Sequence, residues 1–134
     1  MALYQPRHVS AQMAYDALKA NPSGLDWYSW ARAAGLASSQ LSYAQGLLRE
    51  VLQTANGEPL IWKDSAGVYK LAQTKPELDI YLVWRFKSLT TMLYRIEQTM
   101  IAGRAKFGKT RMGKITLRDM KRVREDVADL VAHL

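Results

Sequence analysis

One stretch of the chain has the residue types and spacing of a phosphate-binding loop. Residues 103–110, GRAKFGKT, match G-x-x-x-x-G-K-[ST] at every position, which would place the Lys109 amine on the β and γ phosphates of a nucleotide and Thr110 on magnesium. Such a loop requires a buried strand before it and a helix directly after it. Here a long helical pattern precedes the motif, and Met112 and Gly113 interrupt the segment after it. We therefore expect a flexible basic connector and no enzymatic activity.

Other residues that could do chemistry are few. The chain has no cysteine, which excludes disulfides and thiolate metal ligands, and its two histidines, His8 and His133, lie at opposite ends. Glu125 and Asp129 are one helical turn apart, but the neighbouring cations favour salt bridges over a metal site. The sequence predicts no catalytic residue, no metal, no cofactor and no identifiable small-molecule effector.

The net charge of +7 is unevenly distributed. Residues 1–72 hold six Lys and Arg against five Asp and Glu, a balance of +1, whereas residues 73–134 hold thirteen against seven, a balance of +6. A positive region of this kind attracts polyanions, although it can also be a solvated loop that keeps the protein soluble. The candidate phosphate contacts in the connector are Arg104, Lys106, Lys109, Arg111 and Lys114.

The length of 134 residues suits about one domain with a single core, and no run approaches the roughly 20 apolar residues of a membrane helix. We expect a cytoplasmic, nucleoid-associated protein with no membrane partner. The predicted fold is mainly α with a small β-hairpin, divided into residues 1–74 and residues 75–134.

The first half contains the pattern of a helix, a tight turn and a second helix. We expect a first helix capped by Ser10, and a second helix capped by Asp26 and ended by Gly35. Only residues 36–38 then separate the second helix from the third. A three- or four-residue turn containing glycine between two helices is the helix-turn-helix signature.

The third helix is predicted over about residues 39–53, with Ser38 as its cap. Its expected buried positions are Leu41, Ala44, Leu48, Val51 and Leu52, with Leu47 at the margin. The opposite face has small and polar side chains that can offer donors and acceptors to base edges, although it also fits an ordinary surface helix. The candidate base-reading residues are Ser39, Gln40, Ser42, Tyr43, Gln45 and Arg49.

Two short β-rich runs, residues 60–63 and 68–71, surround a turn and predict an antiparallel hairpin. The expected packed face contains Leu60, Trp62, Tyr69 and Leu71. Lys63 and Lys70 would lie on the other face, together with Ile61 and Val68, and contact DNA phosphates. Such contacts position a protein on DNA without specifying sequence.

By the order of these elements, residues 10–72 resemble the winged helix-turn-helix domains of small bacterial and phage DNA-binding regulators. The resemblance implies a recognition helix in the major groove of double-stranded DNA and a wing along the backbone or minor groove. The chain departs from a basic reader, since Arg49 beside Glu50 is the only cation of the third helix. We expect a sequence-specific transcriptional repressor. The alternatives are an accessory factor for replication, recombination or partition of a mobile element, or a winged-helix protein-interaction adaptor.

The second half predicts two long helices. The first starts at Lys75-Pro76 and has a heptad seam of Leu82, Phe86, Leu89, Leu93, Ile96 and Met100; the second has apolar residues at Met120, Val123, Val127, Leu130 and Leu134. These seams can pair within one chain or between two. The first of these two long helices has further apolar residues outside the seam, namely Tyr81, Val83, Trp84 and Ile101. Because a helix with more than one apolar stripe packs against more than one neighbour, we favour a homodimer.

The aromatic residues invite a second idea, because single-stranded nucleic acid stacks on aromatic platforms. Trp27, Trp30 and Trp84 fall on apolar faces, so we expect them in the core. The exposure of Trp62 and Tyr43 is left open by the sequence.

Overall fold

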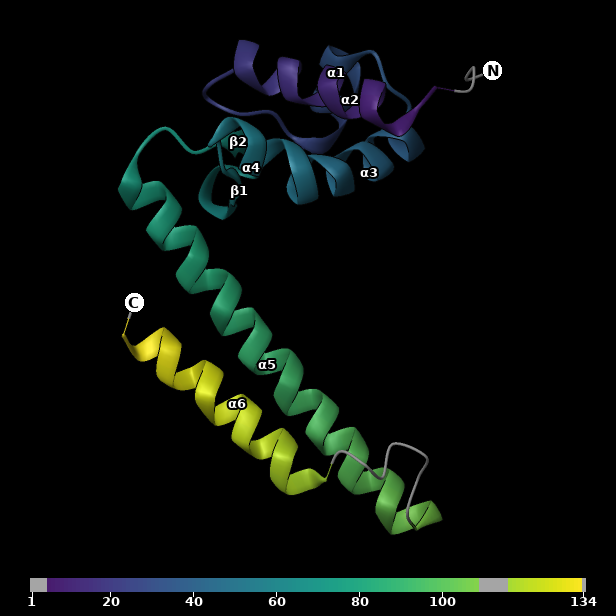
Figure 1. The fold of residues 1–134 in the computed structure, drawn as a ribbon, viewed down its shortest axis with the longest axis vertical. Helices are drawn as coiled ribbons and strands as arrows, with labels where there is room; N and C mark the ends of the chain where they lie inside the picture. Colours follow the sequence, from purple (N-terminus) through teal and green to yellow (C-terminus); the bar gives the residue numbers. More distant parts are fainter. Residues whose placement is uncertain (1–4, 109–115, 134) are drawn as a thin grey trace. The chain divides into compact units, whose positions relative to one another are not determined.

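The structure is a computed structural model that describes residues 5–108 and 116–133 (Figure 1). It is mostly helical with one two-stranded antiparallel sheet, as the sequence predicted. The elements are α1 (Arg7–Ala20), α2 (Trp27–Ala34), α3 (Ser38–Leu47), a π-helical turn (Leu48–Leu52), α4 (Gln53–Asn56), β1 (Leu60–Lys63), a 3-10 turn (Asp64–Ala66), β2 (Val68–Leu71), α5 (Lys75–Phe107) and α6 (Leu117–Ala132).

The chain forms two compact units, Met1–Tyr81 and Leu82–Leu134. The division falls inside α5 rather than at the predicted residue 74, because the first turns of α5 make side-chain contacts with β2 and with the π-helical turn. No helix in the described part of the chain is long and apolar enough to cross a membrane.

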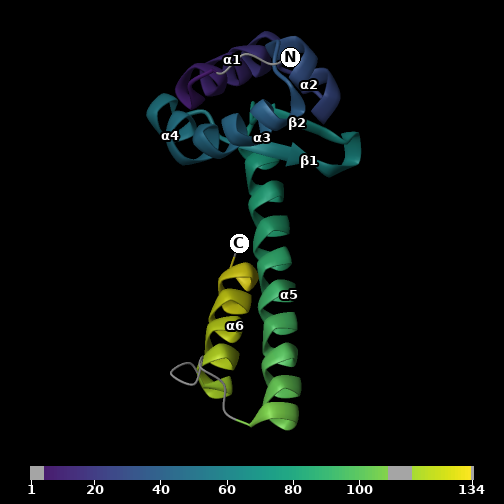
Figure 2. The same cartoon turned by 90° about the vertical axis from the view of Figure 1, so that its right-hand side faces the viewer.

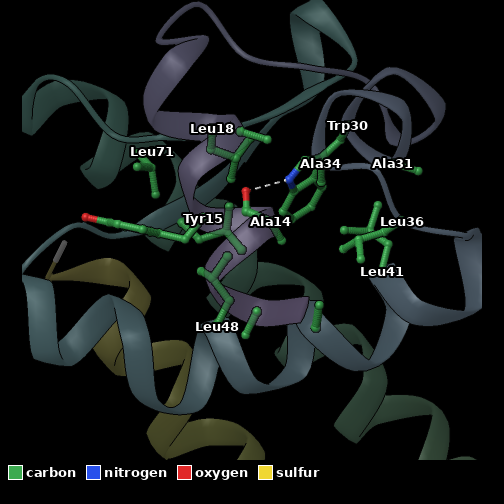
Figure 3. Packing of buried hydrophobic residues seen from close by; sticks show 14 residues of the cluster. Ala14, Tyr15, Leu18, Trp30, Ala31, Ala34, Leu36, Leu41, Leu48 and Leu71 are labelled. Atoms are coloured by element: carbon green, nitrogen blue, oxygen red, sulfur yellow. Dashed lines mark hydrogen bonds between the residues drawn. The ribbon is translucent and has the colours of Figure 1, made fainter. Parts of the chain in front are cut away.

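The core of the first unit lies where α1 meets α2, α3 and the sheet (Figure 3). Trp30 is fully buried, and its indole Nε1 donates to the Ala14 carbonyl at 2.9 Å, which fixes α2 against α1. Ala14 on α1 and Ala44 on α3 are also fully buried, and such small side chains let two helices approach closely. The expected core positions of Trp30 and Leu41 are therefore confirmed.

The first helix begins earlier than predicted. Pro6 precedes its first residue, Arg7, with a φ of −57° that suits the start of a helix. Ser10 is therefore inside α1 and buried rather than at its N-cap, and its hydroxyl donates to Gln5 Oε1 at 3.2 Å.

The predicted ends of the second helix are confirmed. Asp26 Oδ1 accepts a hydrogen bond from the Ser29 backbone N–H at 2.8 Å, and this bond lowers the pKa of the Asp26 carboxyl. Gly35 ends α2 in the left-handed conformation, with a φ of 70°.

The third helical segment differs from the prediction at its start and in its middle. Its N-cap is Ala37 rather than Ser38. After Leu47 the helix widens into a π-helical turn, which adds a residue to the turn and shifts the face of every later position. Val51 is therefore exposed, contrary to prediction, whereas Leu52 packs against the core.

The hairpin has the predicted strands, with Leu60 opposite Leu71 and Trp62 opposite Tyr69. Backbone hydrogen bonds of 2.8 and 2.9 Å also join Tyr69 to Leu25, in the connection between α1 and α2. Gly24 makes this approach possible: its φ is 100°, and a Cβ atom there would lie 2.7 Å from Val68 Cγ2. The hairpin is thus anchored to a segment far from it in the sequence.

In the second unit, α5 and α6 lie side by side and antiparallel (Figures 1 and 2). Arg124 Nε donates to Glu97 Oε2 at 2.8 Å, and the Arg124 guanidinium lies 5.5 Å from the centre of the Tyr94 ring. Thr116 and Asp119 cap α6 reciprocally, which fixes the start of that helix. The two long helices therefore form a helical hairpin within one chain, which is one of the two pairings that the sequence left open.

Candidate nucleic-acid interface

The outer side of α3 carries three of the six predicted base-reading residues, and its inner side packs against the core. Leu41, Ala44 and Leu48 are fully buried against the core. Ser39, Ser42 and Tyr43 point the other way and are exposed, with 61% of Tyr43 accessible. The structure thus brings these three polar side chains together on one accessible helix face.

Two glutamines of α3 have contacts within the chain. Gln40 Oε1 accepts from the Ala37 backbone N–H at 2.8 Å, so its oxygen satisfies the start of the helix. The Gln45 amide, with its oxygen turned toward Arg49, accepts from Nε of that arginine at 3.3 Å. Both side chains are half-buried, and base reading by either requires these contacts to be exchanged.

Arg49 lies in the π-helical turn rather than in α3. Its guanidinium donates to the hydroxyl of Tyr81, in α5, at 3.1 Å. The predicted reader is therefore half-buried and tied to the start of the next long helix. This contact could not be expected from the sequence. Arg49 and Tyr81 are far apart in the chain, and they meet only because the β-hairpin between them folds back.

A cation that the sequence reasoning missed lies beside α3. The Arg7 guanidinium is 4.9 Å from the centre of the Tyr43 ring, within the range of a cation–π interaction. Arg7 is exposed, so it adds positive charge to a helix face that has none of its own in its first two turns. No periodic signal in the sequence marked this residue, since the contact depends on how α1 crosses α3.

The two lysines predicted to contact phosphates differ sharply. Lys63 is exposed at the end of β1. Lys70 is only 6% exposed, and its amine lies 2.6 Å from Glu77 Oε2 in the first turn of α5. The lysine lowers the pKa of the Glu77 carboxyl by this contact, which favours its charged form.

The burial of Lys70 corrects the expectation that its side of the hairpin faces solvent. Ile61, its neighbour on β1, is also buried, so both faces of the hairpin are covered at this end. Lys63 therefore remains in the candidate interface, whereas Lys70 serves as the buried partner of Glu77.

The predicted basic connector is partly helical. Arg104 and Lys106 are exposed in the last turns of α5, with the Lys106 amine 5.1 Å from the centre of the Phe107 ring. The other predicted phosphate contacts, Lys109, Arg111 and Lys114, lie outside the described residues.

The match to a phosphate-binding loop has a different structural context from the one that the motif needs. Its residues Gly103 to Phe107 continue α5, and a helix rather than a strand leads into them. Lys109 and Thr110 lie outside the described residues.

Metal and aromatic candidates can also be placed. Within residues 5–108 and 116–133, no group of three or more His, Asp and Glu side chains could hold a metal ion. Glu125 is 4.0 Å from Lys121, as expected for a salt-bridge partner.

The exposure of two tryptophans can now be stated. Trp62 is half-buried, with its ring 4.7 Å from that of Tyr69. Trp84 is exposed rather than in the core, contrary to prediction, because it lies on α5 beyond the residues opposite α6.

The six residues predicted to form a dimer seam lie on α5, and none of them is buried. Leu82, Leu89 and Ile96 are exposed, and the other three are half-buried. These half-buried residues are Phe86, Leu93 and Met100. Among the described residues of α5 and α6, the only buried side chain is Glu97.

Comparisons with known proteins assign the chain to no family. No protein-family model, no curated protein and no solved structure matches the chain.

Proposed function

We propose that this chain is a sequence-specific double-stranded DNA-binding protein of the winged helix-turn-helix kind and acts as a transcriptional repressor. The single observation that carries the proposal is the polar outer face of α3, where Ser39, Ser42 and Tyr43 are exposed beside the Arg7 cation. Small side chains let a helix backbone approach a groove closely, and hydroxyl groups can donate to and accept from base edges.

The neighbouring elements support this use of α3. Asp26 and Gly35 fix the ends of α2, so the turn that leads into α3 is well defined. The hairpin after α4 places Lys63 at an exposed position, suited to a phosphate contact. On this model of binding, α3 enters the major groove and the hairpin acts as the wing.

Two different sources of binding free energy are expected. The first 72 residues are nearly neutral, so α3 selects the site without much general attraction for DNA. The charge of the second half supplies attraction to phosphates, beginning with Arg104 and Lys106. The same division of labour fits a replication, recombination or partition factor of a mobile element.

An adaptor that binds another protein is the alternative from a different class. It is favoured by one observation: Arg49, the only cation of the α3 segment, is held by Tyr81. A protein-binding face needs no cation there, whereas DNA binding requires Arg7, Lys63 and the second half to supply the charge.

The test replaces an exposed tyrosine inside and outside the proposed reading face. Tyr43→Ala is compared with Tyr28→Ala, because Tyr28 on α2 is 74% exposed and its loss removes the same side chain from another element. Affinities for a selected genomic fragment and for random DNA are measured by fluorescence anisotropy at two salt concentrations.

We expect Tyr43→Ala to weaken binding to the selected fragment about tenfold and to lower the ratio of specific to random affinity. Tyr28→Ala should leave that ratio unchanged. Equal losses on both DNAs for Tyr43→Ala would remove α3 as the reader. No binding to any DNA by the unmodified chain would favour the adaptor.

A further inference from the structure

The seam of α5 divides into two rows of different exposure. Leu82, Leu89 and Ile96 are seven residues apart and between 36% and 43% exposed. The alternate positions Phe86, Leu93 and Met100 are half-buried, and Glu97, which pairs with α6, lies beside them. The chain therefore covers one edge of this heptad seam with α6 and leaves the other edge accessible.

The apolar side chains of α6 also divide into a half-buried row and an exposed row. Met120 and Val127 are half-buried, whereas Val123 and Leu130, also seven residues apart, are exposed. Each helix of the hairpin thus has an apolar row toward its neighbour and a second apolar row beside it.

The two exposed rows lie on the same side of the hairpin. At about 100° per residue, the row of α5 is roughly a quarter turn from Glu97, and the row of α6 is roughly a quarter turn from Arg124 in the same rotational sense. The two helices are antiparallel (Figure 2), so equal rotation from their contact brings both rows to one face. We call this face, formed by Leu82, Leu89, Met92, Ile96, Val123 and Leu130, the apolar hairpin face.

We propose that the apolar hairpin face binds the same face of a second copy of this chain, so that the two hairpins form a four-helix bundle. A heptad row requires a helical partner of the same periodicity, and the second copy supplies one for each row. A two-fold arrangement is self-complementary, since each copy presents the same face. The pairing involves the second unit alone and does not depend on DNA binding.

The charges beside the apolar hairpin face select one arrangement. Beside the apolar hairpin face and away from α6, α5 carries three cations, Arg85, Arg95 and Lys106. The corresponding flank of α6 carries Asp119 and Asp126, with Arg122 at its outer margin. A two-fold axis parallel to the helices places α5 against α6 of the second copy, so that opposite charges meet. An axis across the helices places α5 against α5 and brings the cations together.

The ion pair between Glu97 of α5 and Arg124 of α6 fixes the positions of these charges along the helix axes. Arg95 is two residues before Glu97, and Asp126 is two residues after Arg124, so both are displaced along the hairpin in the same direction by the same amount. An axis parallel to the helices preserves height and places Arg95 opposite Asp126 of the second copy. Within the described residues of one chain, neither Arg95 nor Asp126 forms an ion pair.

The first experiment measures the mass of the full chain without DNA by sedimentation and light scattering. We expect the mass of two chains. Leu89→Asp with Ile96→Asp should reduce it to the mass of one chain. The matched control is Thr91→Asp with Gln98→Asp, which places the same two charges seven residues apart on another, exposed side of α5 and should leave the pair intact.

The second experiment exchanges surface charges that lie outside any core. Arg95→Asp and Asp126→Arg should each raise the dissociation constant of the dimer about tenfold, because a two-fold dimer contains the pair twice. The combined variant should return within about threefold of the unmodified chain. Circular dichroism checks that every variant keeps its helix content.

Three results would overturn the proposal. A single-chain mass for the unmodified protein excludes the second copy as the occupant of the face. Equal disruption by the Thr91 and Gln98 control excludes the apolar hairpin face as the contact. A dimer in which the combined charge exchange is weaker than either single exchange excludes the pairing of α5 with α6 of the second copy.

Discussion

At the scale of single residues, the ion pair between Lys70 and Glu77 has the clearest energetic consequence. Both side chains are largely removed from water, and the amine and carboxylate lie 2.6 Å apart. Breaking a buried pair leaves an uncompensated charge, which is why the loss of one partner costs more than the loss of an exposed pair. This contact joins β2 to the first turn of α5, so it stabilises the part of α5 that belongs to the first unit.

We expect Lys70→Met to lower the free energy of unfolding by on the order of 2 kcal/mol, a value reduced from that of a fully enclosed pair because Glu77 is partly accessible. Urea denaturation at neutral pH measures it. Lys63→Met, an exposed lysine of the adjacent strand, is the control and should change stability by less than about 0.5 kcal/mol. Equal effects of the two substitutions would contradict the structural role of Lys70.

The same pair predicts a dependence on pH. The folded-state pKa of Glu77 is lowered, chiefly by its contact with Lys70. The stabilisation is therefore complete above the unfolded-state pKa of about 4.3 and is lost as the pH falls through the lower folded-state pKa. Urea denaturation at a series of pH values below 5 should show a smaller loss of stability in Lys70→Met than in the unmodified chain. An identical pH dependence would contradict this assignment.

At the scale of elements, the anchoring of the hairpin depends on one close approach. Gly24 brings the connection between α1 and α2 against β2, where Leu25 and Tyr69 exchange backbone hydrogen bonds. An isolated two-stranded hairpin is only marginally stable in water. We therefore expect this contact with the helical core to stabilise the hairpin.

Gly24→Ala should lower the free energy of unfolding by at least about 2 kcal/mol, because the φ of 100° disfavours a side chain and the new methyl group would meet Val68. Gly46→Ala is the matched control: Gly46 lies in α3, and a Cβ there would have no neighbour within 4 Å. Gly46→Ala should raise the free energy of unfolding by up to about 1 kcal/mol, because alanine has a higher helix propensity than glycine. Thermal unfolding of both variants separates the two effects, and a neutral Gly24→Ala would contradict the close approach.

At the scale of the whole molecule, the proposed DNA binding draws on a charge that is concentrated in the second half. Arg104, Lys106, Lys109, Arg111 and Lys114 account for five of its thirteen cations. Each phosphate contact releases counterions, so the number of contacts sets how steeply affinity falls with salt.

Replacing these five cations with glutamine should weaken binding to selected and random DNA alike and flatten the plot of log affinity against log salt by up to about four units. Anisotropy titrations over a range of salt concentrations measure the slope. Lys87→Gln, on α5 outside this group, tests whether any lost positive charge has the same effect and should change the slope by less than about one unit. An unchanged slope after the fivefold replacement would leave these residues as a solvated surface.

The sequence by itself determined the elements whose signals are local. Four features follow from interactions between residues close in the chain. They are the cap at Asp26, the left-handed end at Gly35, the two short strands and the heptad spacing of α5. Such signals depend on helical and strand periodicity and on turn chemistry, which a single sequence displays directly.

Only the tertiary structure decided which polar residues remain accessible. Lys70 and Arg49 look like free cations in the sequence, yet Glu77 and Tyr81 bind them after the chain has folded back on itself. Arg7 showed no signal and lies beside Tyr43 because α1 crosses α3. The reason is the same in each case: contact between distant residues depends on how the elements pack, and local periodicity contains no record of that packing.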